Sequence, residues 1–243
     1  EILAYKNVNG VLTANPRLVE NPRTIEYLSH EEAAELSSSG SDVMNATAIM
    51  LAALKDKRIK VVNLFNPEKF TLIEGYKDDV DLENALLIKG VASKEDNTII
   101  TVESSLMVGQ EGYAARIYEK IASRHRSLDV LTSSGLMISS TIDPYEDDRK
   151  RKDSEKDLGA LERSLAELGK VKLERDFAII SLVGPAVLYN PDDILMRTSK
   201  VMAKNEIKIR MMSLSYNSRN LRITINQENE RKAVQALHDE FFN

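Results

Sequence analysis

The sequence predicts an α+β fold built from two copies of one small module, because the same pattern occurs twice, about eighty residues apart. The first copy runs from Thr98 to Ile142 and the second from Phe177 to Ile225. Each reads as a strand, a loop, a helix and two strands, and each is followed by a further amphipathic helix. We therefore expect two sandwiches, each with a helix layer on an antiparallel sheet. Paired modules of this kind are typical of sensing or binding.

The first copy begins with an alternating apolar strand over residues 99–102 and continues through Gly109-Gln-Glu-Gly112 into a helix that ends near Ala122. Two more strands are expected at 128–131 and 136–142, joined by a Ser/Gly turn. An additional strand over residues 85–91 is expected to precede this copy.

The segment between the copies carries a conspicuous run of charges over residues 146–157. Its signs are mixed, whereas an arm that binds nucleic acid would carry one sign. We therefore interpret the run as the solvent-exposed start of a helix. The apolar stripe of that helix recurs at 3-4-3 spacing, at Leu158, Leu161, Leu165 and Leu168.

The second copy begins with the strand 179–183, followed by a Gly/Pro/Asn loop and a helix over 193–204. A strand at 207–212, a turn at 217–220 and a strand at 221–225 complete it. The last helix carries His238, for which a packing or surface position is the ordinary expectation.

Residues 1 to about 75 have a different pattern and form a separate segment, and the acidic residues 76–83 are the expected linker. A strand over 2–5 leads to a loop rich in Asn and Pro. A helix then begins at Ser29, which precedes Glu31 and Glu32 and so has the pattern of an N-cap with acids in the first turn. A second helix over 47–55 and a strand over 59–64 follow.

Composition excludes several classes of function. The formal charge is −5 and the isoelectric point is about 5.4, which argues against a general binder of nucleic acid or of an anionic membrane. The longest apolar run, 178–188, is broken by Gly184 and Pro185 and is too short to cross a bilayer. No export signal is visible, so the cytoplasm, or the plastid stroma for a plant-type source, is expected. The chain starts with Glu1 within a strand pattern, which suggests a piece of a longer protein.

Candidate chemistry points to ligand binding. The three histidines have no metal-ligand spacing and there is no cysteine, so no metal site is expected. Gly109 and Gly112 lie at a strand-to-helix junction, where free helix N–H groups suit an anion, although a tight turn is the default alternative. Asp129 is expected beside the same strand ends. Helix N–H groups for a carboxylate and an acid for an ammonium are what an amino-acid pocket requires.

Three stretches near the N-terminus resemble the C-terminal third of an aspartate kinase catalytic domain. They are Asn9-Gly-Val-Leu-Thr-Ala-Asn-Pro-Arg17, Ser29-His-Glu-Glu-Ala-Ala-Glu-Leu36, and Asn66-Pro-Glu68 with Thr71-Leu-Ile73. The rest resembles that family's regulatory region, in which one ACT unit is nested in another. The specific matches there are Ser105-Leu-Met-Val-Gly-Gln-Glu-Gly-Tyr113, Ser127-Leu-Asp-Val-Leu-Thr-Ser-Ser134 and the ending, with Ile209-Arg-Met-Met212, Asn220-Leu221 and Ala236-Leu-His-Asp-Glu-Phe-Phe242. They are most similar to the lysine-sensitive branch.

The resemblance implies a domain plan and a fold. Residues 1–75 would be the end of an α/β amino-acid kinase domain, and residues 84–243 would be tandem ACT units of ferredoxin-like βαββαβ topology. The first unit would cover about 96–174, and the second 84–95 together with 175–243.

The nucleotide-side motif departs from the family pattern. Acids of the family have become amides at Asn7, Asn9 and Asn15, while Gly10 and Arg17 are retained. An amide can form hydrogen bonds but cannot supply a carboxylate's charge to a metal–nucleotide site, and phosphoryl transfer depends on positioned charge. The family's His-Pro is also Asn-Ala at 45–46, and Phe70 replaces a glycine. We therefore expect no kinase activity, no catalytic residue and no cofactor in this chain alone; MgATP would be the substrate of a complete kinase.

The effector pocket implied by the resemblance is better preserved. Its residues would be Met107, Gly112, Tyr113, Ala114, Leu128, Asp129 and Ser134. The family's Glu after the serine is Gly135 here, and the loss of that charge-assisted contact costs about 1.5–3 kcal/mol, or roughly tenfold to a hundredfold in affinity.

The leading hypothesis is therefore an allosteric, non-catalytic module of the aspartate-family biosynthetic pathway. It would form a homodimer through ACT units and bind a small amino acid, with lysine as the first candidate, at their interface. One alternative is part of a working aspartate kinase that converts ATP and aspartate to 4-phosphoaspartate and whose N-terminal lobe lies elsewhere or on another chain. A second alternative is a degenerate paralogue that serves as an oligomerisation partner.

Overall fold

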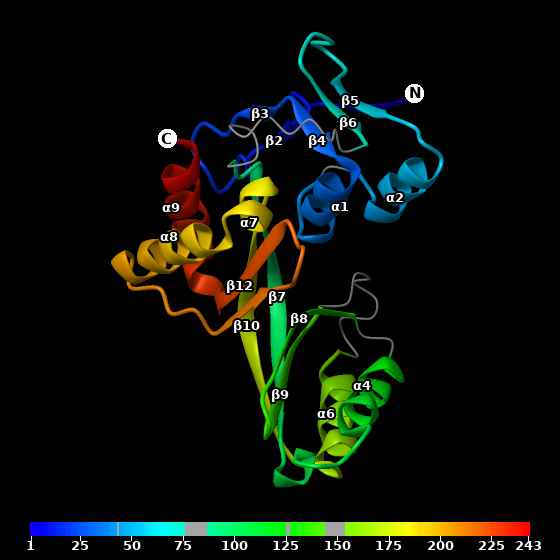
Figure 1. The fold of residues 1–243 in the computed structure, drawn as a ribbon, viewed down its shortest axis with the longest axis vertical. Coiled ribbons are helices and arrows are strands. Elements are labelled where there is room, and N and C mark those ends of the chain that lie inside the picture. Colours follow the sequence, from blue (N-terminus) through cyan, green and yellow to red (C-terminus); the bar gives the residue numbers. More distant parts are fainter. Residues whose placement is uncertain (43, 76–86, 125–126, 144–153) are drawn as a thin grey trace. The chain divides into compact units, whose positions relative to one another are not determined.

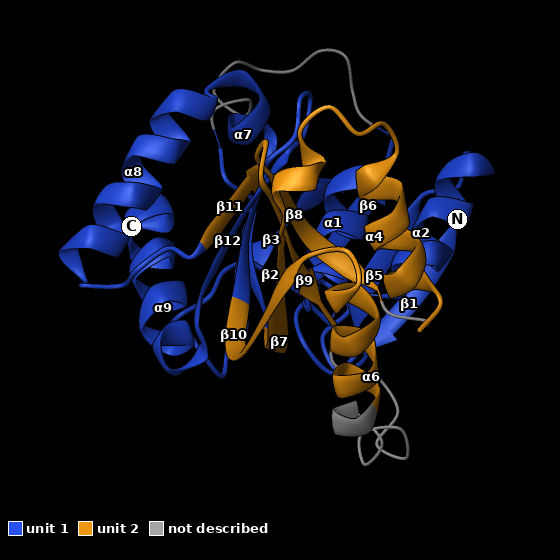
Figure 2. Ribbon diagram, turned by 90° about the horizontal axis from the view of Figure 1, so that it is seen from below, with its two compact units in different colours: residues 1–94, 179–210, 214–243 blue, residues 95–178, 211–213 orange. Residues whose placement is uncertain are grey.

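The computed structural model describes residues 1–42, 44–75, 87–124, 127–143 and 154–243, and these form two compact units (Figure 2). Unit 1 comprises Glu1–Lys94, Ile179–Arg210 and Leu214–Asn243, and unit 2 comprises Glu95–Ala178 and Met211–Ser213. The linker expected at 76–83 lies outside the described residues. The domain boundaries expected from the sequence stay a prediction.

The N-terminal part of unit 1 is built on a mixed four-stranded sheet of order β1-β5-β6-β4. Strand β1 is parallel to β5, β5 is antiparallel to β6, and β6 is parallel to β4. A separate antiparallel pair joins β2 and β3. The strands are β1 (Ile2–Lys6), β2 (Val11–Leu12), β3 (Thr24–Ile25), β4 (Tyr27–Ser29), β5 (Ile59–Asn63) and β6 (Phe70–Glu74).

The first helix, α1 (His30–Ser38), begins where the sequence predicts, because Ser29 and Glu32 form a complete capping box. The Ser29 Oγ accepts the N–H of Glu32, and the Glu32 carboxylate accepts the N–H of Ser29. The second helix, α2 (Ala46–Leu54), is capped by the side chain of Asn45.

A single hydrophobic core unites the N-terminal part of unit 1 with strands of the ACT region. Its members come from the four-stranded sheet, from the β2–β3 pair, from α1 and α2, and from the strands β7 and β10 described below. They are Val11, Ile25, Leu28, Ala33, Leu36, Ile49, Ala52, Ile59, Val61, Ile73, Ala92 and Val183. Just after α1, Gly40 (φ 96°) approaches the backbone so closely that a Cβ would lie 2.2 Å from the Ser93 carbonyl oxygen. Gly40 is therefore a point of close packing between the end of α1 and the backbone at Ser93.

The ACT region is organised around a six-stranded sheet of order β11-β12-β10-β7-β9-β8 (Figure 1). Its two longest strands are β7 (Gly90–Glu103) and β10 (Lys170–Val183), each of 14 residues. This corrects the expectation of separate strands at 85–91 and 99–102, because one strand starts at Gly90 and continues through both. Residues 85 and 86 lie outside the described residues.

The polar residues in the middle of β7 look like a loop in sequence but lie within the strand. Asp96 takes a left-handed conformation (φ 61°), and Asp176 does so at the corresponding position of β10 (φ 63°). Aspartate is one of the few residues that tolerate this conformation. The internal repeat therefore extends to a matching backbone irregularity in each long strand.

Unit 2 contains the first βαββαβ module, in the order β7, α4, β8, β9, α6, β10. Its other elements are η1 (Ser105–Met107), α4 (Tyr113–Ala122), β8 (Leu128–Ser133), β9 (Met137–Ile142) and α6 (Ser154–Ala166). The expected leucine stripe is confirmed, since Leu158, Leu161 and Leu165 are buried and Leu168 packs against the same core. Most of the charge run at 146–157 lies outside the described residues.

The second module follows β10 with α7 (Pro185–Tyr189), α8 (Pro191–Lys204), β11 (Met211–Leu214), β12 (Asn220–Asn226), η2 (Gln227–Asn229) and α9 (Glu230–Phe242). Helix α8 starts two residues before the expected position, since Pro191 occupies its first turn, where a missing N–H costs nothing. The strand expected at 207–212 is wrong at its start, because β11 begins at Met211. Among the residues that the structure describes, no helix has the length and apolar character needed to span a membrane.

Candidate functional site

The loop that follows β7 has the backbone shape of an anion site. Gly109 and Gly112 are both left-handed, with φ values of 74° and 73°. Gly112 is the N-cap of α4 and, as a glycine, offers no side chain to the first-turn N–H groups of Tyr113 and Ala114. These donors therefore face outward at the positive end of a ten-residue helix.

Neighbouring segments of unit 2 hold this loop in place. The Ser104 N–H donates to the carbonyl of Leu136 over 2.9 Å, which ties the loop to the start of β9. The buried Tyr113 donates its hydroxyl to the carbonyl of Leu168. The next residue, Gly169, packs so tightly that a Cβ would lie 2.5 Å from the Glu103 carbonyl oxygen. The α6–β10 turn thus fixes both ends of the loop.

The strand register places the other expected effector residues at the opposite end of the sheet. Leu128 pairs with Ile142, and Ile142 pairs with Thr98, at the start of this part of β7. The Gly109–Gly112 loop instead follows Glu103, five residues further along β7 and therefore about 17 Å away. The expectation that Asp129 lies beside the same strand ends as the loop is wrong. In a right-handed βαβ unit the helix returns the chain to the start of the first strand, so β8 begins there.

A bulge in β8 shapes the backbone at Asp129. The register with β9 shifts between Leu128 and Leu131, and the Val130 N–H donates to the Thr141 Oγ1 over 2.8 Å. Bulges of this kind redirect a side chain. Asp129 is half-buried on the strand that ends the sheet order.

Ser134 lies in the turn between β8 and β9, at the same end of the sheet as the glycine loop. Its N–H donates to the Met137 carbonyl over 2.8 Å. At the adjacent Gly135 a Cβ would meet nothing within 4 Å. One chain therefore brings Met107, Gly112, Tyr113, Ala114 and Ser134 to one end of the sheet, and Leu128 and Asp129 to the other.

The same end of the sheet exposes apolar side chains. Strand β8 is last in the six-stranded order, so one of its edges has no partner strand within the described residues. The exposed apolar residues on or near this edge and the loop are Leu106, Val108, Leu131, Leu136 and Met137, which are 39–66% exposed. An unpaired apolar edge is suited to pairing with another strand.

The nucleotide-side remnant lies in unit 1, at the carboxyl ends of two parallel strands, where α/β sheets bind ligands. Lys6 at the end of β1 is paired with Asn63 at the end of β5. The Asn63 Nδ2 donates to the Asn9 Oδ1 over 2.7 Å. Gly10 (φ 73°) packs on β6, with a virtual Cβ only 2.5 Å from the Thr71 Oγ1. The backbone shape of the motif persists although its carboxylates are amides.

Two of the altered positions, Asn15 and Asn45, have local structural roles. The Asn15 Oδ1 accepts the N–H of Arg17 over 3.0 Å, which closes a short turn, and both residues are exposed, as is Asn7. Asn45, in place of the family's histidine, caps α2 through the N–H of Ala48. Each amide makes or completes a backbone turn, as asparagine does in general.

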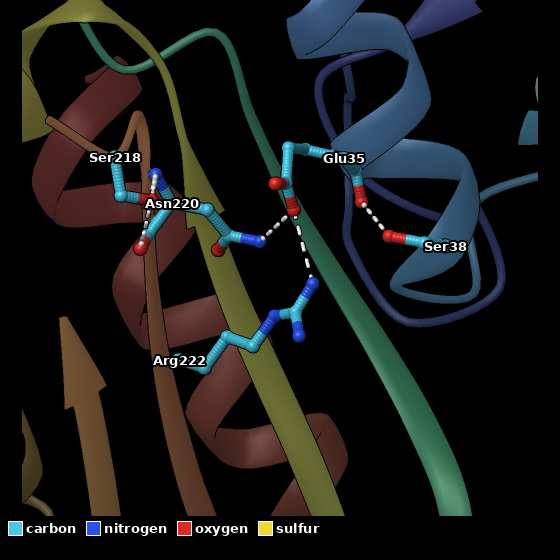
Figure 3. Close-up of polar contacts among 5 residues, drawn as sticks. All are labelled: Glu35, Ser38, Ser218, Asn220 and Arg222. Atoms are coloured by element: carbon cyan, nitrogen blue, oxygen red, sulfur yellow. Dashed lines mark hydrogen bonds and ion pairs between the residues drawn. The ribbon is translucent and has the colours of Figure 1, made fainter. Parts of the chain in front are cut away.

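A polar cluster that sequence reasoning missed joins α1 to β12. The Glu35 carboxylate accepts from the Asn220 Nδ2 over 2.7 Å and from the Arg222 Nη2 over 3.0 Å, as Figure 3 shows. Ser218 holds the Asn220 backbone through two hydrogen bonds of 3.0 and 3.1 Å. A more exposed pair, Glu31 and Arg219, lies beside it. One sequence signal could have indicated this cluster: Glu31 and Glu35 are spaced i,i+4 and so lie on one face of α1.

His238 is buried, as the packing expectation predicts, but it also reaches the N-terminal part of unit 1. Its Nε2 lies 2.9 Å from the Thr13 Oγ1. Burial lowers the pKa of His238 below its usual value, and the charge of Arg23 adds to this, while the charge of Asp239 opposes it. The ring is therefore held mainly neutral at pH 7.

Known proteins match both parts of this architecture. The model of the Amino acid kinase family matches residues 1–63, and a model of the ACT domain matches residues 180–241. The chloroplastic aspartokinase 2 of Arabidopsis thaliana is 30% identical over 244 residues, which cover 100% of this chain and 44% of that protein. The chain thus spans about half the length of the curated relatives it matches.

Solved structures show the same fold. Aspartokinase III of E. coli, solved with aspartate and ADP and with lysine and aspartate, superposes with TM-scores of 0.84 and 0.80 at 22% identity. Those matches cover 100% of this chain and 52% of that one. The ligand-free regulatory subunit of aspartate kinase from Thermus thermophilus matches 64% of this chain and 99% of its own length, with a TM-score of 0.53 at 24% identity.

The matches run through the kinase-type sheet, the tandem ACT units and the connections between them in one order. Along its whole length, this chain is similar to the C-terminal part of aspartate kinases, the end of the amino acid kinase domain followed by the ACT regulatory region.

Proposed function

We propose that the chain is a non-catalytic, allosteric region that binds a small amino acid between the ACT units of two copies, with lysine as the first candidate. The observation that carries this proposal is the register of β8. It separates the anion-binding loop at Gly112 from Asp129 by the length of a strand within one chain. A pocket that needs both groups is incomplete in a single copy.

A second copy completes the pocket by geometry alone. If two β8 edges pair antiparallel about a twofold axis, the start of one strand lies beside the end of the other. The partner's Asp129 then comes to the end of the sheet that carries Gly112 and Ser134. The exposed apolar residues at this edge, including Leu131, would be covered by the same contact.

The chemistry of the completed pocket suits a zwitterion. The first-turn N–H groups of α4 would receive the α-carboxylate, since they are uncapped and lie at the positive end of the helix. The partner's Asp129 would receive the α-ammonium, and Met107 together with the partner's Leu128 would contact the aliphatic part of the ligand. Both of these apolar side chains pack against the core of unit 2.

Two relatives support a regulatory reading. Aspartokinase III of E. coli was solved in complex with lysine and aspartate in a T-state and with aspartate and ADP in an R-state. A separate regulatory subunit of aspartate kinase exists in Thermus thermophilus. In a longer protein, effector binding here would bias a kinase domain between two such states.

The alternative, part of a working aspartate kinase, is favoured by one observation. Gly10 and Thr71 keep the tight packing at the nucleotide side, with the Val11 N–H donating to the Thr71 Oγ1 over 2.7 Å. Against it stand the amides at Asn9 and Asn15, which cannot neutralise a metal–nucleotide charge. Joining the missing N-terminal lobe and assaying ATP-dependent phosphorylation of aspartate decides between the two readings.

Calorimetry with lysine, threonine, methionine and S-adenosylmethionine tests the effector proposal. Saturable binding of one ligand, abolished by Asp129→Ala, supports it. If none of the four ligands binds, a degenerate paralogue that serves as an oligomerisation partner becomes the better interpretation.

A mixing experiment tests whether the site is shared. Ala114→Glu places a carboxylate at an exposed first-turn position of α4, where it favours the helix but repels a ligand carboxylate. Neither the Ala114→Glu variant nor the Asp129→Ala variant should bind the amino acid when it is tested by itself. An equal, re-equilibrated mixture should regain about a quarter of the sites, because half of the dimers then hold one intact pocket. No regain would show that both groups act within one chain.

A further inference from the structure

The residues that carry the nucleotide-side motif form a closed loop between β2 and β3, here called the 13–23 loop. The Thr13 N–H donates to the Arg23 carbonyl over 2.8 Å, and the Arg23 N–H donates back to the Thr13 Oγ1 over 3.0 Å. The Asn15 carbonyl accepts from Leu18 and Val19 and so forms a turn within it. Arg17 lies at the exposed tip of this turn.

The C-terminal helix α9 contacts this loop at both ends and in the middle. The His238 Nε2 lies 2.9 Å from the Thr13 Oγ1, at the base of the loop. The Gln235 Oε1 accepts the N–H of Glu20 over 2.9 Å. At the end of the helix, the Asn243 Oδ1 accepts from the Arg23 Nη2 over 3.5 Å. We call these three contacts the α9 clasp.

The contact at the base of the loop is buried. Thr13 is 6% exposed and His238 is 1% exposed, and the imidazole stacks on Phe242 with 4.6 Å between ring centroids. The His238 Nδ1 is buried and has no hydrogen-bond partner among the described residues. Among the described residues, the Thr13 hydroxyl is therefore the polar group that the imidazole of His238 contacts. Loss of that contact would leave a buried polar ring unsatisfied.

Thr13 also connects the loop to the ACT region through its backbone. Its carbonyl accepts the N–H of Val91, in β7, over 2.8 Å. One residue therefore joins the 13–23 loop, a central strand and the last helix.

We propose that α9 positions the 13–23 loop, so that the C-terminal end of the regulatory region sets the conformation of the nucleotide-side segment. Thr13, Gln235 and His238 are the positioning residues. Whatever displaces α9 from its packed position releases the loop, and a ligand that favours one state of the loop shifts α9 in return. The inference rests on the proposed function only in assigning this loop to the nucleotide side.

Amide hydrogen exchange of the whole chain without ligand tests the clasp, using variants that remove one contact at a time. Thr13→Val keeps the shape of the side chain but removes the hydroxyl, and Thr13→Ser restores it. Gln235→Ala removes the contact with Glu20 at a half-buried position. It keeps the test possible if Thr13→Val, at the buried base of the loop, does not fold. Lys232→Ala is the matched control, because it lies on α9 but donates to the Asn205 carbonyl instead.

The amides of Leu18 and Val19 report on the loop. We expect Thr13→Val to speed their exchange about tenfold, the change that the loss of one buried hydrogen bond produces in an opening equilibrium. Gln235→Ala removes an exposed hydrogen bond and should speed their exchange by a smaller factor, about twofold to threefold. The exchange of α1 should stay unchanged, Thr13→Ser should restore the slow rate, and Lys232→Ala should have no effect. Unchanged loop exchange in both clasp variants, or equal acceleration throughout unit 1, would overturn the proposal. Because no ligand is present, this result is independent of whether an effector binds.

Discussion

In the proposed effector site, we expect Gly135 to decide how well lysine is discriminated from other amino acids. It lies exposed in the turn between β8 and β9, its φ is outside the left-handed region, and a Cβ there would meet nothing within 4 Å. Gly135→Glu therefore introduces neither steric conflict nor backbone strain. A charge-assisted hydrogen bond to a distal ammonium contributes about 1.5–3 kcal/mol. Because the position is exposed, water screens the pair, and we expect the lower end, about tenfold tighter lysine binding.

Calorimetry with two ligands and two variants checks this expectation. Norleucine has the length of lysine without its ammonium, and Gly135→Gln has the shape of the glutamate without its charge. Only the combination of Gly135→Glu with lysine should gain affinity, and the gain should shrink as salt concentration rises. An equal gain for Gly135→Gln, or for norleucine, would refute the electrostatic argument. No gain in any combination would show that this turn does not face the ligand.

Three further predictions concern stability. Glu35→Ala leaves a buried amide donor of β12 without its acceptor and should lower the free energy of unfolding of unit 1 by about 1–3 kcal/mol. Glu31→Ala changes a carboxylate that is 64% exposed and should lower the free energy of unfolding by less than about 1 kcal/mol. Urea titration of both variants measures the two changes. If both variants cost the same, the burial argument fails. Gly10→Ala should cost about 2–4 kcal/mol, since it adds steric conflict with β6 to left-handed strain. Gly109→Ala has the same φ but open space and should cost only about 1–2 kcal/mol by thermal denaturation. The pKa of His238 is lowered by burial, so the unfolded chain takes up the proton first. Stability should thus fall as the pH drops from about 6.5 towards the folded-state pKa. His238→Gln should flatten this slope in urea titrations at several pH values, and an unchanged slope would contradict the assignment.

Local patterns predicted individual elements well. The N-cap at Ser29 is confirmed with its capping box, because both partners lie within four residues of each other. The leucine stripe of α6 is confirmed because helical periodicity alone assigns its buried face. The polar stretch around Asp96 was misread as a break, since the pairing that keeps it in β7 comes from strands far along the chain.

The residues of the candidate site could be proposed from the sequence, but their positions relative to one another in the sheet could not. Gly109 and Gly112 are residues that readily adopt a left-handed conformation, so the sequence indicated the shape of the loop. The resemblance to a known family added Leu128 and Asp129 to the expected site. The direction of β8, and with it the separation of Asp129 from Gly112, depends on how the helix α4 returns the chain to the sheet. The predicted order of strand, helix and strand implies this direction only once the strands are placed in one sheet, which no local residue pattern specifies.

The sequence by itself determined the resemblance to aspartate kinases, the repeated module, the N-cap of the first helix and the amides that stand in place of three carboxylates, because each is a property of neighbouring residues. Only the tertiary structure decided that Glu35 meets Asn220 and that Thr13 meets His238, 225 positions away. The physical reason is that a buried polar side chain takes whichever partner the packing of the core presents to it. In unit 1 that packing brings the two ends of the chain together, since Thr13 near the N-terminus contacts His238 on the last helix.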